Sequence, residues 1–264
     1  MHLIDIGINL AHDSYDADRP SVLARAAAAG VSQMVVTGSS IAGNARAIAL
    51  AASEPGRLFA TAGMHPHHAT ELTTAALAVL QQQARAAEVV AVGECGLDYF
   101  RNYSPHDAQL AAFEAQLALA AEVQKPAFLH LRDASSDFLA LLRQWRPRLT
   151  RAVAHCFTDD QDIARQCLDL DLHIGITGWF CDERRGAHLR DVVRLVPRGR
   201  IMIETDGPYL LPRDLTPRPA SRRNEPGFLP HIARAIAAAR GEEFADFAAH
   251  TTRTARDFFS LPDM

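Results

Sequence analysis

Lysine is nearly missing from this chain of 264 residues, because Lys125 is the only one and arginine supplies the rest of the basic side chains. The formal net charge is −4, so the chain as a whole does not attract nucleic acid. Any polyanionic ligand must therefore be held by a local basic patch rather than by the overall charge.

Cysteine is scarce and long apolar runs are absent. The four cysteines lie far apart and form no CxxC pair, which is typical of reduced thiols in a cytosolic protein. No apolar run approaches the ~20 residues of a membrane span, and the first residues lack the basic and apolar regions of a signal peptide. We expect a soluble cytoplasmic protein that does not associate with membranes.

Internal repeats, low-complexity tracts and interdomain linkers are also absent, which favours a single domain over residues 1–264. The sequence does contain a regular alternation, in which each apolar, β-branched run is followed by an alanine-rich stretch with helical spacing. The predicted strands cover residues 2–6, 33–37, 58–64, 89–94, 127–131, 151–156, 172–177 and 200–205. The predicted helices cover residues 20–29, 42–53, 73–87, 105–124, 135–145, 160–170, 184–195, 228–240 and 243–259.

Eight strand–helix repeats predict an α/β fold in which the strands close into a (β/α)8 TIM barrel. The alternative is an open doubly wound sheet. That fold needs a glycine-rich phosphate turn after an early strand, and Gly7-Ile8-Asn9 is not such a turn. The longest irregular segment covers residues 207–227 and contains five prolines. Because it follows the eighth strand, we expect a stiff wall or lid over the C-terminal mouth.

Acidic and imidazole side chains stand where the apolar runs stop. These positions are Asp5, His65, Glu94, His130, His155, Glu204 and Asp206. In a barrel of parallel strands, polar groups at strand ends gather at one end of the molecule. Histidines and carboxylates that converge there predict a metal-assisted hydrolytic site.

Glu94, His130 and His155 end predicted strands four, five and six, which are neighbours in a barrel. We predict that they ligate one divalent ion and leave a fourth position open for water or a substrate oxygen. Asp206 ends strand eight, where its carboxylate can take the proton of a water molecule or ligate the ion directly. Glu204 lies deeper on the same face, and we expect it to be a buried partner of an arginine or a histidine.

Several motifs resemble those of the TatD-type metal-dependent deoxyribonucleases, in family order and at family spacing over nearly the whole chain. They are Gly63-Met64-His65-Pro66-His67, Gly93-Glu94-Cys95-Gly96-Leu97-Asp98, His130-Leu131-Arg132-Asp133, His155-Cys156-Phe157-Thr158, Glu204-Thr205-Asp206-Gly207-Pro208-Tyr209 and Arg222-Arg223-Asn224-Glu225-Pro226. The TatD-proper branch is the most similar, through Gly175-Ile176-Thr177-Gly178-Trp179 and Cys181-Asp182-Glu183-Arg184-Arg185-Gly186.

The resemblance implies a TIM barrel of the amidohydrolase type and a cytoplasmic, metal-dependent nuclease that acts on DNA ends. For the TatD-proper branch it implies a 3′→5′ exonuclease that prefers single strands and serves DNA repair or turnover. Glu94, His130 and His155 match the family's metal-binding positions. Asp206 matches the carboxylate of strand eight, and His65 matches a substrate-contacting histidine.

One departure concerns the number of metal ions. The wider family begins with Asp-x-His-x-His, and this chain has Gly7 and Asn9 in place of the two histidines. The TatD-proper branch shares this loss, so one and two metals both stay open. The resemblance implies Mg²⁺, whereas two imidazoles and a carboxylate suit Zn²⁺ or Mn²⁺ better. We expect a site that accepts several divalent ions, with Mg²⁺ or Mn²⁺ used in the cell.

Catalysis is assigned to Asp206, which accepts the proton of the attacking water, and to His65, which balances charge in the transition state. The predicted substrate-binding residues are His67, Arg132, Arg184, Arg185, Arg222, Arg223 and Tyr209. Arginine forks match phosphate oxygens, and the aromatic residues Phe100, Tyr103 and Trp179 in the same loops can stack on single-stranded bases. We expect a monomer that binds single-stranded DNA or 3′ ends, with RNA as a second substrate.

Two other functions fit parts of the sequence. A hydrolase of the same barrel type that acts on a small amide, lactone or phosphoester would share the metal site. The arginine-rich mouth and the match over residues 204–226 favour nucleic acid instead. A catalytically inactive binding or scaffold protein would explain the missing histidines of strand one, but it has no physical need for four convergent ionisable groups.

Overall fold

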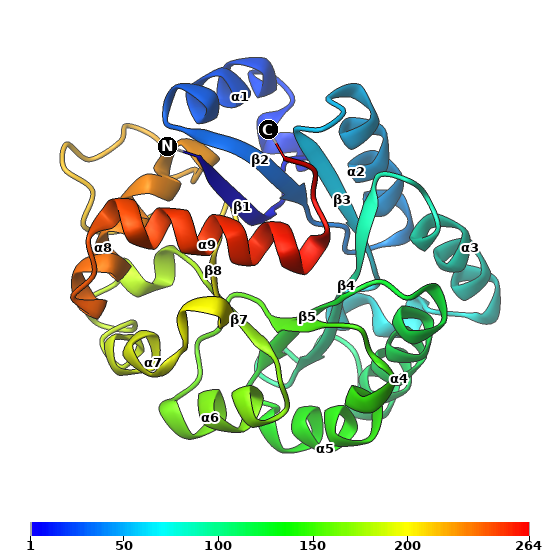
Figure 1. Cartoon of the computed structure of the whole chain (residues 1–264). Helices are drawn as coiled ribbons and strands as arrows, with labels where there is room; N and C mark the ends of the chain where they lie inside the picture. The colour runs from blue at the N-terminus through cyan, green and yellow to red at the C-terminus, as the bar shows by residue number, and fades with distance from the viewer. Residues whose placement is uncertain (1, 264) are drawn as a thin grey trace.

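Eight strands follow one another around the molecule in chain order, and all helices but the last surround them (Figure 1). The structure is a computed structural model and describes residues 2–263. The strands are β1 (Leu3–Ile8), β2 (Val31–Val36), β3 (Leu58–Ala62), β4 (Val89–Asp98), β5 (Ala127–Arg132), β6 (Ala152–Ala154), β7 (His173–Ile176) and β8 (Ile201–Ile203). Every successive pair from β1 to β8 is parallel, which confirms the predicted (β/α)8 TIM barrel in a single domain.

The helices alternate with the strands as predicted. They are α1 (Arg19–Ala28), α2 (Ile41–Ser53), α3 (Thr74–Ala84), α4 (His106–Val123), α5 (Ser135–Trp145), α6 (Gln161–Asp169), α7 (Leu189–Leu195), α8 (Leu229–Arg240) and α9 (Phe244–Phe259). Local signals set several of the boundaries. Ser40 and Asp160 accept hydrogen bonds from backbone N–H groups in the first turns of α2 and α6, and Gly241 ends α8 in the left-handed conformation.

The barrel closes where β1 meets the segment after β8. The backbone N–H of Asp206 donates to the carbonyl of Gly7 at 2.8 Å, and that of Asn9 donates to the carbonyl of Gly207 at 2.9 Å. Asp5 is fully buried and accepts hydrogen bonds from the backbone N–H and the hydroxyl of Thr205, at 2.9 and 2.5 Å. Asp5 therefore joins β1 to the end of β8 and does not face the mouth with the other predicted polar residues.

The two ends of the barrel differ. Inside it, Ile6, Val35 and Phe128 pack in a buried apolar cluster that also includes Phe258 and Phe259 of α9. Helix α9, coloured red, crosses the barrel in Figure 1 and packs against β1 and β8. A TIM barrel has a packed interior and carries its functional groups at the C-terminal ends of the strands, so the mouth opposite α9 is the place for a site.

Two elements differ from their predicted bounds by four residues or more at one end. Strand β4 continues to Asp98, four residues past the predicted end. Helix α7 begins at Leu189 instead of residue 184, because a turn precedes it: the N–H of Gly186 donates to the carbonyl of Asp182 at 2.7 Å, and the Asp182 carboxylate accepts the N–H of Arg184 at 3.0 Å. No helix among residues 2–263 is both long and apolar enough to cross a membrane.

Candidate metal centre

A cleft of about 590 Å³ opens at the C-terminal end of the barrel. It is lined by residues that follow or end different strands, including Asn9 after β1, His65 after β3, Glu94 and Asp98 in β4, His130 in β5, His155 after β6 and Asp206 after β8. The structure thus brings together the predicted ligands and the predicted catalytic residues, the first and last of which, His65 and Asp206, are 141 positions apart in the sequence.

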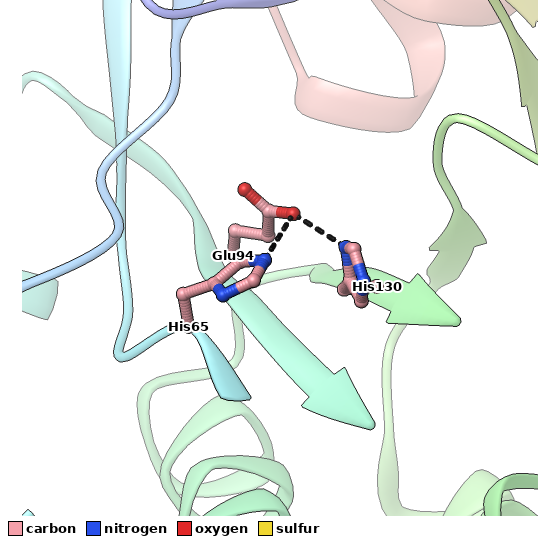
Figure 2. A group of neighbouring side chains, drawn as sticks. All are labelled: His65, Glu94 and His130. Carbon is pink, nitrogen blue, oxygen red and sulfur yellow. Dashed lines mark hydrogen bonds and ion pairs between the residues drawn. The ribbon is translucent and has the colours of Figure 1, made fainter. Parts of the chain in front are cut away.

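One carboxylate oxygen lies at the centre of this group. Oε1 of Glu94 is 2.8 Å from Nδ1 of His130, 2.8 Å from Nε2 of His155 and 3.3 Å from Nε2 of His65. Figure 2 shows the His65 and His130 rings converging on this oxygen from two sides. The glutamate and the two histidines predicted as ligands are therefore in direct contact, and His65 joins them.

His65 is closer to the ligand group than the sequence suggests. Its ligand atom, those of Glu94 and those of His130 all lie within 4.8 Å of one another, so these three residues could hold a metal ion together. The ring centroids of His65 and His130 are 4.5 Å apart, against 6.0 Å for His130 and His155. The structure thus makes His65 a candidate ligand beside Glu94 and His130.

The side chains suit a divalent cation. Ligand atoms that are each ~2.1 Å from an ion and at right angles to one another lie ~3.0 Å apart, which is the spacing found around Glu94 Oε1. Nε2 of His130 is buried without a hydrogen-bond partner in the described chain, and Oδ2 of Asp98 lies 3.5 Å away. Imidazole nitrogen with carboxylate oxygen is a donor set for Zn²⁺ or Mn²⁺ and also tolerates Mg²⁺.

Charge in the centre follows from this packing. Burial lowers the pKa of His65 to about 4, so its imidazole is neutral and able to bind a cation. Burial by itself opposes ionisation of Glu94, yet the imidazoles of His65 and His155 hold its pKa well below its ordinary value. The centre therefore keeps a carboxylate anion beside a neutral imidazole at neutral pH.

Glu204 supports His155 from behind. It is fully buried, and its Oε2 lies 3.3 Å from Nδ1 of His155, while its Oε1 accepts the backbone N–H of Cys156 at 2.5 Å. Burial disfavours a charged imidazole, but the carboxylates of Glu94 and Glu204 raise the pKa of His155 well above its ordinary value. A carboxylate on one ring nitrogen fixes the orientation of the other, the usual arrangement behind a metal-binding histidine.

Asp206 lies at the mouth of β8 in a left-handed backbone conformation, with φ of +53°. Its Oδ1 accepts a hydrogen bond from Nδ2 of Asn9 at 2.9 Å. Burial raises the pKa of Asp206 to about 8, with a further contribution from Glu94 and Glu204, while His155 opposes the shift. Asn9, which stands where the wider family has a histidine, thus orients this carboxylate.

The sequence analysis assigned no role to Asp98. Its Oδ2 is 2.7 Å from Nε2 of His67 and 3.5 Å from Nε2 of His130, so it links the second histidine of the His65-Pro66-His67 motif to the centre. Burial by itself opposes ionisation of Asp98, but the neighbouring imidazoles of His130 and His67 hold its pKa well below its ordinary value. Its spacing of four from Glu94, on one face of a strand, was the available signal.

The predicted substrate-binding residues divide into two groups. The cleft is lined by His67, Arg132, Arg185 and Tyr209. The other three, Arg184, Arg222 and Arg223, are not among the described residues that line the cleft. The guanidinium of Arg223 instead donates to both carboxylate oxygens of Asp18, at 2.8 and 2.7 Å, and this ion pair attaches the segment after β8 to the start of α1.

Comparison with known proteins assigns the family. The sequence model of the TatD-related DNases matches residues 4–260. The chain belongs to the TatD-related DNase family. As a member of this family it is a hydrolase and a nuclease, which confirms the family and the enzyme class predicted from the motifs.

Individual TatD relatives match over their full length. The chain is 50% identical over 259 residues to the 3′-5′ ssDNA/RNA exonuclease TatD of Pantoea vagans, covering 98% of this chain and 100% of the relative. The solved structure of YJJV, a TatD homologue from Escherichia coli K12, has a TM-score of 0.89 at 27% identity and covers 98% of each chain. A TatD family hydrolase from Entamoeba histolytica has a TM-score of 0.87 at 25% identity and covers 99% of each chain.

Proposed function

We propose that this chain is a divalent-metal-dependent exonuclease that removes nucleotides from the 3′ ends of single-stranded DNA and of RNA. The observation that carries the proposal is the convergence of three imidazoles on one oxygen of Glu94 at the floor of the cleft. The names of the curated relatives, 3′-5′ ssDNA/RNA exonuclease TatD, support the polarity and the substrate.

The mouth of the cleft suits an unpaired strand. The exposed large apolar side chains of the described chain include three aromatic residues, Phe100, Tyr103 and Tyr209, which are 55%, 68% and 53% exposed. Phe100 and Tyr209 line the cleft, and Tyr103 lies edge-on to His67 with ring centroids 4.7 Å apart. Exposed aromatic rings cost solvation unless they are covered, and nucleobases in a single strand can cover them by stacking.

Arg132 is placed to hold a phosphate between these rings. Its guanidinium carbon lies 4.8 Å from the ring centroid of Phe100 and 4.9 Å from that of Trp179. The hydrogen bond to the hydroxyl of Thr158 is long, at 3.5 Å, so most of its donors stay available. A guanidinium fixed between two aromatic faces presents its fork to a phosphodiester at little further entropic cost.

For the chemical step we propose that Glu94, His130 and His155 hold the cation, with Asp206 beside them. When bound, a divalent cation polarises a phosphate oxygen and neutralises its charge. Asp206, oriented by Asn9, would position the attacking water. The positive charge of a bound cation would favour the ionised form of this carboxylate, which accepts the proton. His65 and Arg132 would face the charge that develops on the phosphate as the water oxygen bonds to phosphorus and the bond from phosphorus to the 3′ oxygen of the preceding nucleotide breaks; that oxygen takes a proton from solvent, and a 5′-mononucleotide is released.

The identity of the cation follows from two considerations. Nitrogen-rich ligands favour Mn²⁺ or Zn²⁺, whereas Mg²⁺ is the ion implied by the family resemblance. We propose that the site accepts several divalent ions and that Mg²⁺ or Mn²⁺ supports the reaction in the cell. We further propose that the protein acts as a monomer in the cytoplasm, in the repair or turnover of DNA.

End-labelled oligonucleotides test the function. With a 5′ label, 3′→5′ digestion of single-stranded DNA gives a ladder that shortens with time, whereas a 3′ label is released at once as a mononucleotide. We expect this pattern for single-stranded DNA and RNA, slower digestion of a blunt duplex, and loss of activity in chelator that Mg²⁺ or Mn²⁺ restores. An Asp206→Ala preparation reports contaminating nucleases. Immediate release of the 5′ label, or restoration by zinc alone, would contradict the proposal.

A further inference from the structure

A second group of metal-ligating side chains lies outside the cleft. It consists of the thiol of Cys181, the carboxylate of Asp214 and the imidazole of His231, whose ligand atoms all lie within 4.8 Å of one another. The three residues come from three parts of the chain. Cys181 ends the 3-10 helix η4 (Gly178–Cys181), Asp214 lies in the irregular segment after β8, and His231 lies in the first turn of α8.

The group is compact and partly open to solvent. Nε2 of His231 is 2.7 Å from Oδ1 of Asp214, and their side chains are 34% and 41% exposed. Cys181 is buried, with 5% of its surface exposed. A buried thiol beneath two exposed ligands gives an ion a protein-bound floor and a path of entry from water.

The arrangement does not fit a catalytic triad. In a triad the imidazole stands between nucleophile and carboxylate and takes the proton of the nucleophile. Here the carboxylate of Asp214 stands between the other two groups, because it contacts both Nε2 of His231 and the thiol of Cys181, which is buried. Thiolate, imidazole and carboxylate are instead three donors that Zn²⁺ accepts together in tetrahedral sites, at ~2.0–2.3 Å from the ion.

We infer that Cys181, Asp214 and His231 form a zinc site, with water as the fourth ligand, that fastens the segment after β8 to η4 and α8. Because it has a thiolate ligand, this site should prefer different metal ions from the site at Glu94. Soft sulfur ligands select Zn²⁺ and related ions and disfavour Mg²⁺, which prefers oxygen. The inference does not depend on the proposed nuclease activity.

The proposed zinc site adjoins two segments that line the cleft. Tyr209 and Leu210 lie in the same segment as Asp214, and Trp179 belongs to η4; all three line the cleft. Gly178 already lies against this segment, since a Cβ there would overlap with the carbonyl oxygen of Leu210. An ion that joins both segments fixes one wall of the cleft and stabilises the folded chain by binding it in preference to the unfolded one.

Cobalt substitution of the full-length protein tests the site. Chelator-treated protein is titrated with Co²⁺, whose bond to a thiolate produces a strong near-ultraviolet charge-transfer band and whose tetrahedral complexes absorb in the visible. We expect both features at one equivalent per chain and their displacement by Zn²⁺ but not by Mg²⁺. Cys181→Ser should abolish the charge-transfer band. His231→Gln should weaken Co²⁺ binding at least tenfold and serves as the second variant where Cys181→Ser does not fold.

Two cysteine variants serve as matched controls. Cys167→Ser removes a buried thiol elsewhere in the chain, and Cys156→Ser removes the thiol that lines the cleft. Both should keep the charge-transfer band. In addition, Zn²⁺ at a hundred times its dissociation constant should raise the melting temperature of the wild-type protein by about 5 to 10 °C. Absence of the band in the wild-type protein, or its loss with Cys156→Ser while Cys181→Ser keeps it, overturns the inference.

Discussion

Gly7 leaves the space that the carboxylate of Glu204 occupies. A Cβ at position 7 would overlap with Oε2 of Glu204 and lie 3.1 Å from the Phe128 ring. Gly175 on β7 leaves space for the other carboxylate oxygen of Glu204, since a Cβ at position 175 would lie 2.6 Å from Oε1. Position 7, where the wider family has a histidine, is thus a glycine that makes room for the buried carboxylate of Glu204, and this carboxylate contacts Nδ1 of His155.

This relationship predicts a strong coupling between positions 7 and 204. Gly7→Ala should lower the free energy of unfolding by about 1 to 3 kcal/mol, because the new methyl group overpacks a buried site. In a Glu204→Ala background the same substitution should cost much less, since the Phe128 ring is then the remaining close neighbour. Urea unfolding of the four proteins of the cycle measures both values. Gly199→Ala, where a Cβ meets nothing within 4 Å, is the control; equal costs in both backgrounds would contradict the coupling.

Asp206→Ala should reduce the rate of cleavage by about 10²- to 10⁴-fold, because the group that orients the water and takes its proton is lost. Binding of a single-stranded oligonucleotide should change little, since Arg132 and the aromatic residues remain. Cleavage rates together with fluorescence anisotropy separate the two effects. Near-normal cleavage by the variant would remove Asp206 from the mechanism.

His155 and His65 can be told apart by metal binding. We expect His155→Ala to weaken Mn²⁺ binding by more than the ~10- to 100-fold that loss of an outer partner costs, because a direct ligand disappears. His65→Ala should keep Mn²⁺ binding within about tenfold and lose cleavage activity instead. Calorimetric titration with Mn²⁺ measures the affinities, and this hard ion avoids the thiolate of Cys181. The reverse pattern would make His65 the ligand and His155 the supporting residue.

Arg132 and Arg222 form a matched pair for substrate binding. Arg132→Ala should weaken the binding of single-stranded DNA and reduce the slope of log affinity against log salt by ~0.7 to 1, as expected for one lost phosphate contact. Arg222→Ala removes the same charge from an exposed position outside the cleft lining and should leave the slope unchanged. Fluorescence anisotropy at several salt concentrations gives both slopes, and an equal effect of the two substitutions would reject the proposed path of the strand.

His173 should make the folded protein sensitive to acid. It begins β7, is 8% exposed and packs edge-on against Phe258, with ring centroids 4.8 Å apart. Burial, together with repulsion from Arg200 and Arg151, lowers the pKa of His173 to about 4. The unfolded chain therefore takes up a proton near pH 6.5, before the folded chain does, and stability falls as the pH decreases from 6.5 to about 4.

A substitution isolates this contribution. His173→Gln removes the titrating group, so the free energy of unfolding of the variant should rise relative to that of the wild type by on the order of 2 to 3 kcal/mol between pH 7 and pH 4. Denaturant unfolding across this range measures the difference. His2→Gln serves as the control, since it removes an exposed histidine. A constant difference between wild type and His173→Gln would show that His173 titrates alike in both states.

The sequence by itself determined the barrel and the identity of its chemical groups. The alternation of apolar runs with alanine-rich stretches sets which segments form strands, and parallel strands in a closed sheet must place their ends together. For this reason the sequence indicates His65, Glu94, His130, His155 and Asp206 as groups that meet at one end of the barrel. The motifs that contain them also carried the family resemblance.

Tertiary structure decided which of these groups touch. The contacts of Glu204 with His155, of Asp98 with His67 and of Arg223 with Asp18 join residues 49, 31 and 205 positions apart. No local pattern encodes such a pair, because the distance between two side chains depends on strand register and barrel closure. Arg222 and Arg223 therefore resembled phosphate ligands in the sequence, while the fold placed them outside the cleft and paired Arg223 with Asp18, the residue that precedes α1.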